Sequence, residues 1–165
     1  MNRVYPHCMH CGSKLNDGDY PKACPSCGRM HFLNPLPVAV LLVPVDDGVL
    51  TIRRAIAPQI GELALPGGYI DLEETWEQAA ARELEEETGL RLDPAKVSHF
   101  ATISSQRGDG VILIFGVATA QPASVLEHIA CGPETSEAIV VKSPQTLAFE
   151  LHTEVLARYF EQNQR

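Results

Sequence analysis

Apolar runs separated by short polar turns predict a series of β-strands along the middle of the chain. Residues 38–45 are almost wholly apolar, which is typical of a buried strand. Asp46-Asp47-Gly48 is a turn signal that leads into a hairpin partner at residues 49–53. Later β-rich stretches cover residues 97–105, 111–119 and 137–142, the first two joined through residues 107–110. The main part of the chain is therefore expected to contain a β-sheet.

Two segments have the pattern of helices. Near the C-terminus, apolar residues recur at helical spacing at Leu151, Val155, Leu156, Tyr159 and Phe160, which predicts an amphipathic helix over residues 147–162. The second predicted helix lies within residues 68–90, where small and apolar residues form one side. Pro66-Gly67-Gly68 predicts a tight turn before it, and Gly89 stands where a helix often ends in a left-handed residue. Strands around one helix and a final helix on the other face suggest a mixed sheet between helices.

A proline-rich connector, Asn34-Pro35-Leu36-Pro37, cannot continue a helix and divides the chain into two regions. The 165 residues are 45% hydrophobic, enough for one sizeable core and a small accessory module. The predicted organisation is an accessory module at residues 1–34 and a main domain at residues 35–165.

Three glutamates of the first predicted helix, Glu83, Glu86 and Glu87, lie on one face at about 100° per residue, while Glu85 points away. Crowded carboxylates repel one another, and a hard divalent cation such as Mg²⁺ relieves that repulsion through oxygen ligands. The spacing therefore indicates a metal site, with a solvated acidic surface as the plainer alternative.

Four of the five cysteines form two close pairs, Cys8-x2-Cys11 and Cys24-x2-Cys27, each followed by a glycine. Such pairs on two turns can close a tetrahedral Zn²⁺ site, and a short polar segment folds poorly without one. Two disulfides are disfavoured by the expected compartment, and a redox pair is disfavoured because there are two such turns. Cys131 is expected to be a packed residue or an exposed thiol. The nearby imidazoles, interpreted as bystanders, are His7, His10 and His31.

A four-cysteine zinc site has no open position, so the metal is expected to be structural. The module carries Lys14, Lys22 and Arg29 without a dense basic cluster, which favours a scaffold or dimerisation element over a nucleic-acid reader. A net charge of −8, from 13 Lys and Arg against 21 Asp and Glu, also argues against a polybasic surface for nucleic acid or membranes. No apolar run reaches the ~20 residues of a membrane span, and residues 1–14 lack a signal-peptide core. A cytoplasmic location is expected.

The glutamates belong to a longer spaced pattern. Five residues separate Gly68 from Glu74, seven more precede Arg82 and Glu83, and Leu84, Glu86, Glu87, Gly89 and Leu90 follow in register. The segment matches Gx5Ex7REUxEExGU, the Nudix box, at every position. The chain thus resembles the Nudix hydrolases and, with its cysteine pairs, the zinc-ribbon branch that includes NADH, FAD and ADP-ribose pyrophosphatases. The resemblance implies an α/β/α sandwich with a mixed sheet, preceded by a small N-terminal zinc ribbon.

The resemblance also implies a reaction and roles for residues. It implies Mg²⁺- or Mn²⁺-dependent hydrolysis of a nucleoside diphosphate linked to another group. The implied metal ligands are Glu83, Glu86, Glu87 and the main-chain carbonyl of Gly68, with Arg82 orienting Glu74 or Glu83.

The general base stays open between Glu83 and a glutamate of a later loop. That loop offers Glu134 and Glu137, of which Glu137 is preferred because it abuts the final strand; a structural role is the alternative for both. No substrate-binding residue is assigned, although Arg53 and Arg54 could reach a phosphate or remain solvated.

Substrate preference rests on a departure from the family. NADH pyrophosphatases carry an SQPWPFPxS array after the box, and residues 104–109 here lack it. This favours an FAD, ADP-ribose or nucleotide-sugar substrate over NADH. Other hypotheses are a nucleotide sensor without turnover and an RNA 5′ pyrophosphohydrolase, and an isopentenyl-diphosphate isomerase is disfavoured because those relatives use a modified box. A homodimer is expected from the family.

Overall fold

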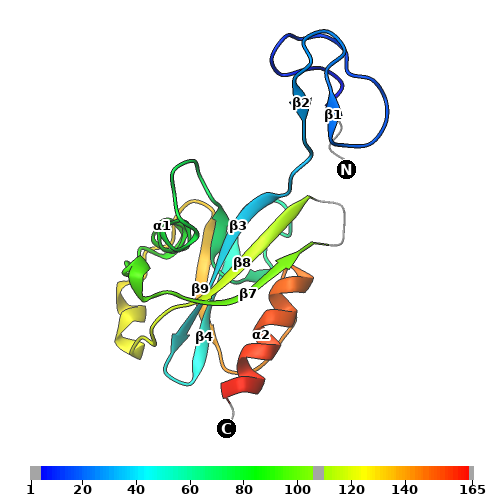
Figure 1. Cartoon of the computed structure of the whole chain (residues 1–165). Helices are drawn as coiled ribbons and strands as arrows, with labels where there is room; N and C mark the ends of the chain where they lie inside the picture. Colours follow the sequence, from blue (N-terminus) through cyan, green and yellow to red (C-terminus); the bar gives the residue numbers. More distant parts are fainter. Residues whose placement is uncertain (1–4, 106–109, 164–165) are drawn as a thin grey trace.

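The computed structural model describes residues 5–105 and 110–163. The predicted turn residues Arg107, Gly108 and Asp109 lie outside the described residues. An N-terminal segment with two short antiparallel strands, β1 (Lys22–Ala23) and β2 (Met30–His31), extends beyond the end of β3 (Figure 1). The division of the chain at residue 34 stays a prediction.

The main sheet has seven strands and is mixed, as predicted. Strand β3 (Leu36–Val45) forms the expected hairpin with β4 (Gly48–Arg54) and runs parallel to β8 (Val111–Val117). The remaining neighbours are antiparallel. They are β5 (Leu63–Ala64), β6 (Gly67–Tyr69), β7 (Ser98–Ser104) and β9 (Thr135–Val141).

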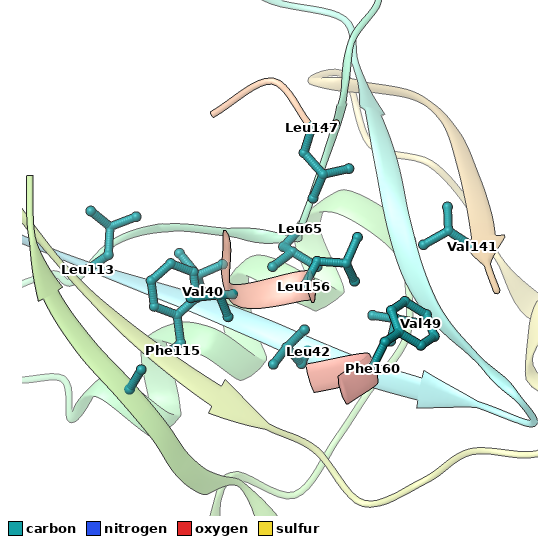
Figure 2. Close-up of a cluster of buried hydrophobic side chains, with 12 residues drawn as sticks. Val40, Leu42, Val49, Leu65, Leu113, Phe115, Val141, Leu147, Leu156 and Phe160 are labelled. Atoms are coloured by element: carbon teal, nitrogen blue, oxygen red, sulfur yellow. The ribbon is translucent and has the colours of Figure 1, made fainter. Parts of the chain in front are cut away.

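Two helices cover opposite faces of this sheet (Figure 1). On β3, Val40 and Leu42 point into the core beneath α2 (Glu150–Asn163), whereas Leu41 and Val43 point into the core beneath α1 (Trp76–Thr88). Figure 2 shows the first core, where Leu156 of α2 meets side chains from several strands. Apolar residues on both faces of β3 explain why its sequence is a continuous hydrophobic run.

The ends of α1 follow from its sequence. Thr75 and Gln78 form a capping box, in which each side chain accepts from the other residue's backbone N–H. At the other end, Gly89 has a φ of 75° and its N–H donates to the carbonyl of Glu85, as expected for a left-handed helix terminus. The acidic box is therefore held on a helix with defined limits. The short 3-10 helices are Pro94–Lys96 and Ala123–His128.

Several boundaries differ from the sequence predictions. Helix α2 begins at Glu150, three residues after the expected start at residue 147, and β9 begins at Thr135 in place of residue 137. Strand β3 begins at Leu36, inside the expected connector, because residues 36–42 pair in parallel with 111–117. The turn expected at Pro66-Gly67-Gly68 contains strand β6, which pairs with residues 38–40. In the part of the chain that the structure describes, no helix is long and apolar enough to cross a membrane.

Candidate active site and metal centres

The acidic face of α1 lies beside β6. Glu87 is buried, at 8% exposure, and its carboxylate accepts a 3.0 Å hydrogen bond from the N–H of Gly67. Glu83 is half-buried, and Glu86 is exposed one turn further along. Glu85 points away, as predicted, and forms a 2.8 Å ion pair with Arg91. The helix thus offers three neighbouring carboxylates that range from buried to exposed.

Arg82 links the carboxylates of the box. Its guanidinium makes a bidentate pair with Glu74, at 2.8 and 3.0 Å, and a 2.8 Å bond to Glu83. It also donates to the carbonyl of Tyr69 at 3.0 Å and lies 3.4 Å from Glu86. Hydrogen bonding to Glu74 first, and then to Glu83, raises the pKa of Arg82 further above its usual value. Arg82 therefore contacts both Glu74 and Glu83, the two carboxylates that the resemblance offered as its partners.

Burial dominates the electrostatics of the ligand candidates. Burial first, and then the negative charges of Glu83 and Glu134, raise the pKa of Glu87 to about 8, although the Gly67 hydrogen bond and the charge of Arg54 oppose the rise. Burial also raises the pKa of Glu83, an effect that Arg82 opposes. A hard divalent cation would offset this cost, because it favours the ionised carboxylates. The donor set therefore fits Mg²⁺ or Mn²⁺.

Two glycines let the backbone approach the carboxylates. Gly67 has a φ of 151°, and a Cβ there would overlap the backbone of Ala39. A Cβ on Gly68 would overlap the carboxylate of Glu83, so the main chain of Gly68 lies directly against that group. This contact suits the implied pairing of the Gly68 carbonyl with the glutamates around one ion.

The loop before β9 contacts the C-terminal end of α1. The N–H of Gly132 donates to the carbonyl of Glu87 at 3.2 Å, and the carbonyl of Glu134 accepts from Ala55 at 2.8 Å. The charge of Glu134 acts on Glu83 and Glu87. Glu134 and Glu137 are both exposed, but Glu137 lies on β9 and forms a 3.0 Å ion pair with Arg53. This placement favours Glu134 as the general base from the later loop, whereas the sequence favoured Glu137. The assignment stays a prediction.

Arg54 borders the acidic face from the end of β4. Its guanidinium lies 5.1 Å from the ring centroid of Phe149, and its Nε donates to the carbonyl of Pro58 at 2.7 Å. The positive charge of Arg54 lowers the pKa of Glu87, which places it within electrostatic reach of the site. The sequence offered Arg54 as a phosphate contact but could not show its contact with Phe149, because the two residues are adjacent only in the folded chain.

The four paired cysteines converge at the N-terminal end. All four sulfur atoms lie within 4.8 Å of one another, with Cys8 and Cys27 at 3.7 Å and Cys11 and Cys24 at 3.6 Å. A tetrahedron with Zn–S bonds of about 2.3 Å has edges of roughly 3.8 Å, so the cluster fits Zn²⁺. In residues 5–105 and 110–163, no other set of three or more ligand atoms converges as closely, including the box carboxylates.

The neighbouring histidines have different environments. His31 is buried, with Nε2 3.3 Å from the sulfur of Cys8, which suits an imidazole N–H donating to a thiolate. His10 is exposed and lies 3.4 Å from Arg29. His7 is exposed, as is Cys131. Of these histidines, His31 is therefore the one whose imidazole lies against a cysteine ligand, whereas His10 contacts Cys8 through its backbone N–H at 3.4 Å.

The sequence matches the NUDIX domain over residues 35–159. The chain therefore belongs to the Nudix family, and the fold agrees with that membership. A solved Nudix hydrolase from Nitrosomonas europaea superposes with a TM-score of 0.76 at 26% identity, covering 97% of this chain and 93% of that one.

Curated relatives match over shorter stretches. The chain is 34% identical over 90 residues to an NAD-capped RNA hydrolase NudC from Stutzerimonas stutzeri, covering 53% of this chain and 32% of that protein. It is 41% identical over 59 residues to an ADP-ribose pyrophosphatase from Methanocaldococcus jannaschii, covering 36% of this chain and 35% of that protein. The matched stretches thus span about a third of the length of these relatives.

Proposed function

We propose that this chain is a metal-dependent Nudix pyrophosphatase that hydrolyses the diphosphate bond of a nucleoside diphosphate linked to another group. The substrate class is a dinucleotide or nucleotide sugar of the FAD, ADP-ribose or NADH type, and one product is a nucleoside monophosphate. The observation that carries the proposal is the juxtaposition of Glu83 and Glu87 of α1 with the backbone of Gly67 and Gly68. Both curated relatives are named for substrates that contain a diphosphate.

In the proposed mechanism, Glu83, Glu86, Glu87 and the Gly68 carbonyl hold Mg²⁺ or Mn²⁺. The bound ion would neutralise phosphate charge and lower the pKa of a water molecule. Arg82 keeps the carboxylates in place through the pairs described above and has few donors left for a ligand. Its role is therefore orientation of the ligands, with no direct contact to phosphate.

Two residues from other elements complete the proposed chemistry. Arg54 has the charge and position to contact a phosphate oxygen, and stacking on Phe149 restricts its guanidinium. Glu134 takes a proton from the attacking water, with Glu83 and Glu137 as the alternative bases. Hydrolysis then adds one water across the P–O–P linkage and leaves a phosphate group on each product.

The zinc ribbon is proposed to have a structural role. The four cysteines would fill all positions of a tetrahedral ion, which leaves none for substrate. The ribbon is then a scaffold or a dimerisation element, and a homodimer in the cytoplasm is the proposed state. A nucleotide sensor without turnover is less favoured, because the charged residues that the box pattern specifies are all present. Glu74, Glu83 and Glu86 contact Arg82, and Glu87 accepts from the N–H of Gly67.

A substrate panel tests the proposal. Release of nucleoside monophosphate is measured with Mg²⁺ and with Mn²⁺ on FAD, NADH, ADP-ribose, CoA, nucleotide sugars, dinucleoside polyphosphates, triphosphorylated RNA and NAD-capped RNA. A dominant small-molecule substrate supports the proposal, and preference for NAD-capped RNA would move the function to RNA ends. No turnover on any substrate, with the protein folded and zinc bound, would favour the sensor.

A further inference from the structure

His152 is a buried imidazole on α2, across the sheet from the acidic helix. It is 6% exposed and packs edge-on against Phe115 and Phe149, with ring centroids 5.8 and 5.0 Å away. Burial first, and then the positive charge of Arg54, lowers the pKa of His152 to about 3. The ring is therefore neutral at physiological pH, and one of its nitrogens is free to accept a hydrogen bond.

The hydrogen bond comes from Leu65, in the segment that leads into the Nudix box. The N–H of Leu65 donates to Nδ1 of His152 at 3.2 Å, which assigns the ring proton to Nε2. The side chain of Leu65 lies in the same core as Leu156 of α2 (Figure 2). Helix α2 thus holds both the main chain and the side chain of Leu65.

The next backbone groups are held by other elements. The carbonyl of Pro66 accepts from Leu41 of β3 at 2.9 Å, and the N–H of Gly67 donates to Glu87 of α1 at 3.0 Å. Three consecutive residues are therefore fixed by α2, β3 and α1 in turn, and the fourth is Gly68. Just before α2, the N–H of Ala148 donates to the carbonyl of Leu63, which ties the start of the helix to the same segment.

We propose that His152 is a positioning residue that sets the main-chain position of Gly67 and Gly68 at the candidate metal site. This inference rests on the proposed function. Without the imidazole acceptor, the buried N–H of Leu65 loses its partner, and the loop must shift to find another. The shift is transmitted within three residues to the Gly68 carbonyl, so metal binding weakens although no ligand side chain has changed.

Two substitutions separate positioning from packing. In His152→Asn, the side-chain Oδ1 can occupy the place of Nδ1 and accept from Leu65. In His152→Leu, the volume is largely kept and the acceptor is lost. Phe160→Leu is the control, because Phe160 is buried in the same helix and core without a hydrogen bond to the loop. Each full chain is compared by NMR amide exchange at Leu65 and Gly67 and by Mn²⁺ binding, followed by the EPR signal of free Mn²⁺.

The proposal predicts that His152→Leu weakens Mn²⁺ binding by about 10-fold or more and speeds exchange at Leu65 and Gly67, as for loss of a group that orients a ligand. His152→Asn restores both, and Phe160→Leu changes neither beyond its effect on global stability. Wild-type exchange and Mn²⁺ binding in His152→Leu would overturn the proposal. Absence of turnover in the wild-type chain would contradict the proposed function alone, because exchange and Mn²⁺ binding are measured without a substrate.

Discussion

Replacement of the buried carboxyl of Glu87 by an amide should change how the stability of the metal-free protein depends on pH. The carboxyl has an ordinary pKa near 4.5 in the unfolded chain and, through burial first, a pKa of about 8 in the folded one. Between these values the folded protein holds one more proton than the unfolded chain. The free energy of unfolding therefore falls as pH rises through this window.

The size of the effect follows from the pKa difference. Each pH unit within the window costs about 1.4 kcal/mol, so roughly 4 kcal/mol is lost between pH 4.5 and 7.5. For a chain of this size, 1 kcal/mol corresponds to about 2–4 °C in Tm. In Glu87→Gln this loss is absent, because the amide does not titrate. The difference in Tm between Glu87→Gln and the wild-type chain should therefore grow by on the order of 10 °C over this pH range.

The assay is thermal unfolding by circular dichroism at several pH values, in buffer free of Mg²⁺ and Mn²⁺. Chelators are omitted, because they would compete for zinc, and zinc content is checked by mass spectrometry. Glu85→Gln is the matched control, since Glu85 is on the same helix and exposed. Adding Mg²⁺ at pH 7.5 should raise the Tm of the wild-type chain and leave that of Glu87→Gln unchanged. Parallel pH profiles for Glu87→Gln and the wild-type chain would refute the reasoning.

Three further predictions concern the phosphate contact, the base and the zinc. Arg54→Gln should raise KM by about 10-fold or more in steady-state assays, as for loss of a hydrogen bond to a charged group. Arg53→Gln removes the pair with Glu137 and a 2.8 Å hydrogen bond to the carbonyl of Gly61, neither of them a phosphate contact, and should leave KM near wild type. Glu134→Gln should lower kcat by about 100-fold or more with little change in KM. An equal loss of kcat in Glu137→Gln, without a loss in Glu134→Gln, would instead identify Glu137 as the general base. Cys24→Ser should lose zinc by mass spectrometry and disorder the ribbon by NMR, and full zinc content would contradict the four-cysteine assignment.

Local sequence patterns predicted the main elements because each depends on nearby residues. The hairpin around Asp46 and the end of α1 at Gly89 are confirmed, as turn and capping signals act within a few positions. The early start of β3 at Leu36 was not predicted, since it depends on parallel pairing with Val111, far along the chain. Distance in sequence therefore accounts for the missed start of β3.

The candidate site divides in the same way. The box spacing predicted the common face of Glu83 and Glu87, because helical geometry alone sets it. The closeness of Glu134 to these carboxylates depends on how the loop before β9 packs on α1, which no local pattern encodes. His152 did have a signal: it lies three and four residues before Val155 and Leu156, on the buried face of the closing helix. What the spacing could not show is its partner, Leu65.

The most direct test of the central claim compares metal-dependent hydrolysis by the wild-type chain and Glu86→Gln. Glu86 is exposed on α1, so its substitution should leave folding and zinc content intact. With the best substrate of the panel, Mg²⁺-dependent release of nucleoside monophosphate should be lost in Glu86→Gln while circular dichroism and Tm remain those of the wild-type chain. A Glu86→Gln protein with wild-type turnover and Mg²⁺ dependence would contradict the assignment of the box glutamates as the metal site.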